Sequence, residues 1–168
     1  MSIEGNRSSA GPGAWGWVPP LLWAVGLLSV FLPMIRSGLR LTHGGLGDPR
    51  LVHYILEHGF LWMTGAAGHE SFWSPPVFSP HPNVSAYTDL LLGYGPLYWP
   101  WRLLHLPPDT SFQLWMLGTW STNFLAAFLL LRHGIGGGRL GAACGAYLIA
   151  FGNPLQSQFG HPQLTPLF

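Results

Sequence analysis

The stretch WGWVPPLLWAVGLLSVFLPMI, residues 15–35, carries no charged side chain along its whole length. A helix needs about 20 mostly apolar residues to cross a bilayer, and this stretch is long enough. Trp15 and Trp17 at its start and Arg36 after its end are typical of the two membrane–water boundaries. A cleaved signal peptide is the alternative, but its apolar core usually has about 7–15 residues and a small-residue cleavage site follows it. The stretch therefore predicts a membrane-spanning helix.

The composition of the whole chain points to the same class. Of the 168 residues, 8% are charged and 48% are hydrophobic, whereas soluble domains have about 25% charged residues. The formal net charge of +1 gives no basic surface for nucleic acid. The single cysteine, Cys144, excludes an internal disulfide and a CxxC metal site, and we expect it to be a small buried packing residue.

Two further apolar runs are FQLWMLGTWSTNFLAAFLLL, residues 112–131, and LGAACGAYLIAFG, residues 140–152. Both are predicted to span the membrane; the second is short, and its small residues allow close helix packing. LTPLF, residues 164–168, begins another apolar run. We therefore predict an all-α fold, a multispanning bundle of about three spans plus the start of a fourth, in which residues 15–168 are a truncated membrane domain of a larger protein.

The short turn at residues 132–139 gives the orientation. Arg132 and Arg139 flank it, and short loops with arginine usually face the cytoplasm. Residues 1–14, small and polar, would then be a disordered cytoplasmic tail, while the loop 36–111 and the segment 153–163 would face outward. Three arginines close to the first span on its outer side favour the opposite orientation, namely Arg36, Arg40 and Arg50.

The outer loop has its own helical signals. Apolar residues recur at helical spacing over 49–63, which predicts a helix that can lie along the membrane surface. A second short helix is expected at 86–94, and the aromatic run at 95–109 is typical of a membrane interface.

The helix at 49–63 is preceded by Asp48 and Pro49, an acid followed by proline. One interpretation is that Asp48 caps the helix, a role worth about 1 kcal/mol, and that Glu57 forms an ordinary surface pair with His53. The other is chemical, because an ionised carboxylate at the outer boundary can take a proton from a hydroxyl or bind a divalent cation. The two interpretations are compatible.

Four more side chains are candidates for the same site. Arg50 can meet a phosphate as a charged fork. His161 and Gln163, in GHPQLTP, are expected on the same side of the membrane, and His161 can hydrogen-bond a phosphate or carry a proton, although it can also be a simple interfacial residue. Asp89 is the other acid candidate of the outer loop, as a turn cap or as a second acid of the site.

The segments GDPRLVHYILEH (47–58), FWSPPVFSPHPNVSAYTDLLLGYGPLY (72–98) and GHPQLTPLF (160–168) resemble parts of bacterial integral-membrane glycosyltransferases of the GT-C superfamily. The resemblance implies sugar transfer from a polyprenyl-phosphate carrier to an acceptor hydroxyl on the outer face of the bacterial inner membrane. Many members carry paired or spaced acids in the first outer loop, where this chain has a lone Asp followed by Pro.

On this resemblance, Asp48 takes the position of the catalytic acid and Asp89 assists it. Arg50, His161 and Gln163 would bind the substrate. The cofactor stays open, with a divalent cation at Asp48 as one option. The missing C-terminal spans of the parent protein would be needed, so the fragment alone is expected to be inactive.

The rival class is a non-enzymatic membrane protein, such as a transporter or an envelope assembly factor. Transporters usually place ionisable groups near the middle of the bilayer. The three apolar runs contain no Asp, Glu, Lys, Arg or His, and their one carboxamide outside the run ends is Asn123. This distribution of ionisable residues therefore favours chemistry at the membrane–water interface over a transport path through the bilayer.

Overall fold

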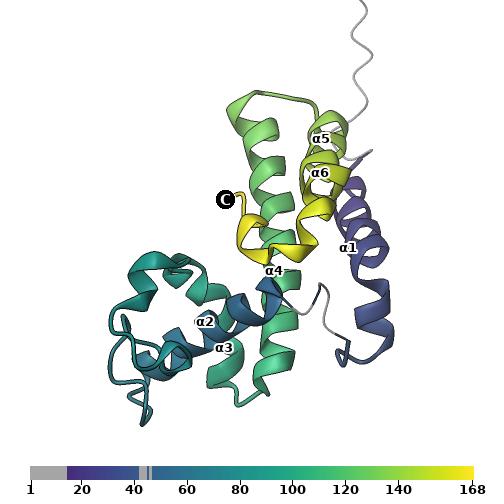
Figure 1. Cartoon of the computed structure of the whole chain (residues 1–168). Coiled ribbons are helices and arrows are strands. Elements are labelled where there is room, and N and C mark those ends of the chain that lie inside the picture. Colours follow the sequence, from purple (N-terminus) through teal and green to yellow (C-terminus); the bar gives the residue numbers. More distant parts are fainter. Residues whose placement is uncertain (1–14, 42–44, 46) are drawn as a thin grey trace, which may run out of the picture.

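The computed structural model describes residues 15–41, 45 and 47–168, and every regular element in these ranges is helical (Figure 1). This confirms the all-α fold class. The predicted tail, residues 1–14, lies outside the described residues.

Two described helices are long and apolar enough to cross a membrane. They are α1 (Val18–Arg36) and α4 (Pro108–Leu129), which continues into the π-helical turn η4 (Leu130–Gly134). Large apolar side chains on their surfaces are exposed, among them Leu21, Val25, Leu28, Leu125 and Leu129. These two helices match the first two predicted spans and support a membrane protein.

The third predicted span is not confirmed. Its helix, α5 (Arg139–Phe151), has 13 residues. At about 1.5 Å per residue it is about 20 Å long, short of the roughly 30 Å hydrocarbon core. Gly152 leaves the helical conformation, and Pro154 follows in the short helix α6 (Asn153–Gln156), so the chain turns before a span is complete.

Helices α1, α4 and α5 pack against one another (Figure 1). Four alanines of α5 are buried in this packing, at 142, 143, 146 and 150, as expected for a helix rich in small residues. Gly26 of α1 meets the ring of Phe151, because a Cβ at this position would lie 2.3 Å from Cδ2 of that ring. Cys144, in contrast, is exposed, so its expected role as a buried packing residue is wrong.

The described part of residues 36–111, which the sequence predicts to be an outer loop, forms a second helical layer beside the lower half of α4 (Figure 1). Helix α2 (Asp48–Met63) agrees with the helix predicted at 49–63 and buries Val52 and Leu56. The aromatic run forms α3 (Gly95–Leu103). The prediction of a short helix at 86–94 is wrong. The chain there forms two 3-10 turns, η2 (Val84–Tyr87) and η3 (Leu92–Tyr94), with extended backbone at Thr88 between them. An earlier 3-10 turn, η1 (Pro76–Phe78), precedes them.

A charged cluster joins α2 to α3. The carboxylate of Glu57 accepts hydrogen bonds from Arg102 Nε at 2.8 Å and Nη2 at 2.9 Å, and from the Tyr98 hydroxyl at 2.6 Å. The pKa of Tyr98 is raised by burial and by this bond to Glu57. Glu57 is therefore a partner of α3 and not the surface partner of His53 that its spacing suggested.

The C-terminal segment, residues 153–168, folds back onto the middle of α4. It contains α6 and the 3-10 turns η5 (Ser157–Gly160) and η6 (Pro162–Leu164). Asn123 donates to the Thr165 carbonyl at 2.7 Å and accepts from the Leu167 N–H at 2.8 Å, while Trp120 stacks on Phe159 with ring centroids 5.1 Å apart. The lone carboxamide near the centre of α4 therefore anchors this segment.

Candidate functional site

Asp48, at the start of α2, meets two residues of the C-terminal segment. Its Oδ2 lies 2.6 Å from His161 Nδ1 and 3.1 Å from Gln163 Nε2. Three predicted site residues, 113 and 115 positions apart in sequence, are thus in direct contact. The pKa of Asp48 lies below its ordinary value because Gln163 and then His161 hydrogen-bond its charged form.

The position of Asp48 at the start of α2 determines which groups its carboxylate can bond. Gly47 occupies the N-cap position and Asp48 is already helical, with no capping hydrogen bond from a side chain. The capping interpretation is therefore wrong. Asp48 still lies in the first turn, where the helix dipole favours a negative charge, and its carboxylate bonds the C-terminal segment instead of backbone N–H groups.

The other side of the contact is a fixed turn. Pro162 restricts the backbone of His161, whose φ and ψ are −132° and 70°. Pro162 and Thr165 are buried, and the Thr165 hydroxyl donates to the Pro162 carbonyl at 2.7 Å. With Asn123 holding the Thr165 backbone, the turn that carries His161 and Gln163 is tied to α4.

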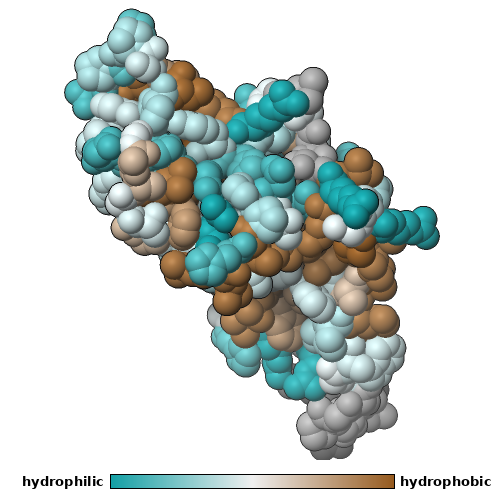
Figure 2. All heavy atoms as spheres, turned by 90° about the horizontal axis from the view of Figure 1, so that it is seen from below, coloured by the Kyte–Doolittle hydropathy of each residue, from teal (hydrophilic) through white to brown (hydrophobic). Residues whose placement is uncertain are grey.

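The side chains of the contact between Asp48 and His161 remain partly exposed. The side chain of His161 is 56% exposed and that of Asp48 is 40% exposed. Figure 2, which views the molecule from below, shows a hydrophobic zone across the middle of that face with hydrophilic residues on either side. An exposed ion pair contributes little to stability in general, commonly about 0–1 kcal/mol, so stability alone is a poor reason for this arrangement.

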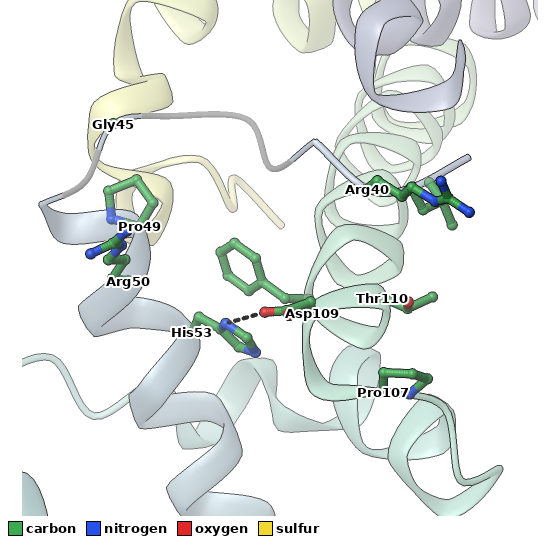
Figure 3. A pocket seen from close by; sticks show the side chains of 10 residues that line it. Arg40, Gly45, Pro49, Arg50, His53, Pro107, Asp109 and Thr110 are labelled. Atoms are coloured by element: carbon green, nitrogen blue, oxygen red, sulfur yellow. Dashed lines mark ion pairs between the residues drawn. The ribbon is translucent and has the colours of Figure 1, made fainter. Parts of the chain in front are cut away.

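The first turn of α2 also borders a cavity of about 540 Å³ (Figure 3). Its opposite wall is the start of α4. The lining residues are Leu39, Arg40, Gly45, Pro49, Arg50, His53, Pro107, Asp109, Thr110 and Phe112. The predicted phosphate ligand Arg50 therefore lies at this cavity, two residues after Asp48.

A histidine and an aspartate meet at the wall of this cavity. His53 Nδ1 of α2 lies 3.7 Å from Asp109 Oδ1 of α4, as the dashed line in Figure 3 marks. The pKa of His53 is lowered, chiefly by burial, although Asp109 opposes this effect. The pair joins α2 to the first turn of α4.

Arg40 is a second arginine of the cavity that the sequence did not single out as a ligand. Neither Arg40 nor Arg50 forms an ion pair with any residue in the described ranges. The sequence signal that could have identified Arg40 is its position, four residues after the end of α1 and before the start of α2.

Asp89 is not brought into this contact. It is exposed between η2 and η3, and no hydrogen bond or ion pair joins it to another part of the chain that the structure describes. Its assisting role stays a prediction.

The side chains in contact with Asp48 offer a divalent cation few oxygen ligands. One oxygen of the carboxylate accepts two hydrogen bonds, and the nearest atom of Gln163 is its nitrogen. Within the described ranges, no group of three or more His, Cys, Asp or Glu side chains is placed to hold a metal ion. Mg²⁺ and Ca²⁺ are bound through oxygen atoms, so a cation at Asp48 would need further oxygen ligands from water or substrate.

Comparison with known proteins finds no relative whose function could be compared with this chain. No protein-family model matches the chain, and neither a curated protein nor a solved structure matches it.

Proposed function

We propose that the chain is part of an integral-membrane glycosyltransferase of the GT-C type. It would transfer a sugar from a polyprenyl-phosphate carrier to an acceptor hydroxyl at the outer face of a bacterial inner membrane. The observation that carries the proposal is the contact of Asp48, twelve residues after the first candidate span, with His161 and Gln163, in which the carboxylate and the imidazole stay exposed.

The proposed reaction needs two kinds of group. The acceptor oxygen forms a bond to the anomeric carbon while the bond from that carbon to the phosphate oxygen breaks, and the electron pair leaves with the lipid phosphate. The Asp48–His161 pair receives the proton of the acceptor hydroxyl. Arg50, at the neighbouring cavity, contacts the phosphate as a planar charged donor.

The rival proposal is a transporter or an envelope assembly factor. Gln113 of α4 favours it, because this side chain is fully buried and neither amide atom has a partner among the described residues. A polar side chain inside a span can line a transport path. The candidate site residues Asp48, His161 and Gln163, however, lie on α2 and on the C-terminal segment, and this position supports the enzyme.

Replacing the carboxylate tests the enzymatic proposal. In the full-length parent protein, Asp48→Asn should lower sugar transfer from a labelled polyprenyl-phosphate sugar by about 100-fold or more, because general acid–base groups commonly contribute about 10²–10⁴-fold. The assay would use membranes that contain equal amounts of each variant.

The matched control is Glu70→Gln, which removes an exposed outer-loop acid that contacts only local backbone. It should leave the transfer rate unchanged. Equal transfer by Asp48→Asn and the native protein would refute the catalytic proposal, and absence of any transfer by the native parent would favour the transporter or assembly factor.

A further inference from the structure

The contact between Asp48 and His161 fixes which imidazole nitrogen carries a proton. An ionised carboxylate can only accept hydrogen bonds, and the hydrogen bonds of Gln163 and His161 hold the pKa of Asp48 below its ordinary value. The 2.6 Å contact to Oδ2 therefore requires a hydrogen on His161 Nδ1. In the neutral ring the lone pair then lies on Nε2.

The two members of the pair differ in what they can still bind. Oδ2 of Asp48 already accepts from both His161 and Gln163. Nε2 of His161 has no hydrogen bond to any residue that the structure describes, and its side chain is the more exposed of the two. A substrate hydroxyl can therefore reach the imidazole more readily than the bonded oxygen.

We infer that His161 Nε2 is the atom that takes the proton of the acceptor hydroxyl, and that Asp48 is a positioning residue for His161. This inference rests on the proposed glycosyl transfer and reverses the roles that the sequence suggested, in which Asp48 was the base and His161 a phosphate ligand.

The proposed step moves one proton while one bond to the anomeric carbon forms and another breaks. The acceptor O–H bond breaks and its proton moves to Nε2, while the oxygen bonds the anomeric carbon and the lipid phosphate leaves with its electron pair. The resulting imidazolium donates from Nδ1 to the Asp48 carboxylate, whose negative charge stabilises it. Gln163 holds the carboxylate, so the ring keeps its orientation through the step.

Chemical rescue tests this assignment directly. In the full-length parent protein, His161→Gly should lose about 100-fold or more of the transfer rate, and added imidazole should restore a part of it, because a free imidazole can occupy the space of the missing ring. A pure folding role for His161 would show no rescue. The Asp48→Asn variant retains its own imidazole and should not respond to added imidazole.

The double variant gives a second readout. When two groups act as a unit, removing both costs little more than removing one. His161→Gln with Asp48→Asn should therefore transfer sugar about as slowly as His161→Gln alone. Full transfer by His161→Gln, or losses that multiply in the double variant, would overturn the inference while leaving the proposed function intact.

Carbethoxylation by diethyl pyrocarbonate tests the pair without any sugar transfer. His161 of the native parent should be modified several times faster than exposed His81, since its Nε2 is free and oriented, and Asp48→Asn should slow the modification of His161 alone. Equal modification rates in the native protein and Asp48→Asn would overturn the positioning role. If the native parent shows no transfer, the glycosyltransferase proposal fails and this measurement still decides whether Asp48 activates the ring.

Discussion

Asp48 and Glu57 lie nine positions apart on the same helix, and each bonds residues that are distant in sequence. Glu57 is 16% exposed and has a permanently charged partner, Arg102, together with the Tyr98 hydroxyl. Asp48 is 40% exposed and bonds an imidazole. The first carboxylate joins two helices, while the second is coupled to a group that can exchange a proton. The two carboxylates of α2 therefore differ both in burial and in the type of partner that they bond.

The largest stability effect is expected at the Glu57 cluster. Arg102→Met keeps most of the side-chain volume but leaves Glu57 without its charged partner. Breaking a buried pair costs about 3–5 kcal/mol, and the residual exposure here lowers our expectation to about 2–3 kcal/mol. Denaturant unfolding in detergent, followed by circular dichroism, would measure it.

Arg50→Met is the matched control, since Arg50 is exposed and has no ion pair with a described residue. It should change the unfolding free energy by less than about 0.5 kcal/mol. Equal stability of the two variants would mean that the Glu57 cluster does not hold α2 on α3, and the contrast with Asp48 would disappear.

The next largest effect is expected where the C-terminal segment meets α4. Asn123→Leu leaves the Thr165 carbonyl and the Leu167 N–H unpaired and should cost about 1–2 kcal/mol. Amide hydrogen exchange should accelerate around residues 161–167 but not in α2 and α3. Sugar transfer should fall too, because His161 loses its support.

Thr122→Val, one position earlier, removes only a hydroxyl that bonds its own helix at the Gly118 carbonyl. It should leave hydrogen exchange around 161–167 unchanged. Uniformly faster exchange in Asn123→Leu would show that Asn123 stabilises the whole bundle and does not specifically hold the site.

The parts of the structure that follow from local sequence were predictable. The apolar helix predicted at 15–35 and the helix predicted at 49–63 depend on apolar length and on helical period, which are properties of neighbouring residues. The run at 140–152 has the same apolar character, but it ends early at Gly152 and Pro154 because the chain turns back onto α4.

The site was predictable only in part. The choice of Asp48, His161 and Gln163 depended on residue chemistry and on their expected side of the membrane, and the structure places them in contact. That Asp48 bonds an imidazole and does not cap its helix depends on where the C-terminal segment folds. The pairing of Glu57 with Arg102 likewise depends on packing across 45 positions.

A smaller effect is expected from acidification, which should lower the stability of the protein through His58 in the second half of α2. His58 is 2% exposed; its Nε2 donates to the Phe72 carbonyl and its Nδ1 lies 2.7 Å from His69 Nδ1. The pKa of His58 is lowered, chiefly by burial and also by repulsion from His69. Below the ordinary histidine pKa of about 6.5 the unfolded chain therefore binds a proton that the folded chain does not, so the stability should fall as the pH falls from that value.

Thermal unfolding between neutral pH and pH 5 would measure this effect. His58→Gln should be less stable at neutral pH but should lose less stability on acidification than the native protein. The exposed His81→Gln variant is the control and should follow the native pH dependence. An identical slope in His58→Gln would place the proton uptake elsewhere.

The smallest effect is expected at Asp89, which tests whether an exposed acid between η2 and η3 is enough for function. Asp89 is exposed and joined to no other described residue by an ion pair, so Asp89→Asn should change the unfolding free energy by less than about 0.5 kcal/mol. Sugar transfer by the parent protein should also stay within about twofold of native, whereas Asp48→Asn should lose about 100-fold. A loss at Asp89 as large as that at Asp48 would mean that a second acid reaches the substrate from η2–η3, and the site would then extend beyond the contact between α2 and the C-terminal segment.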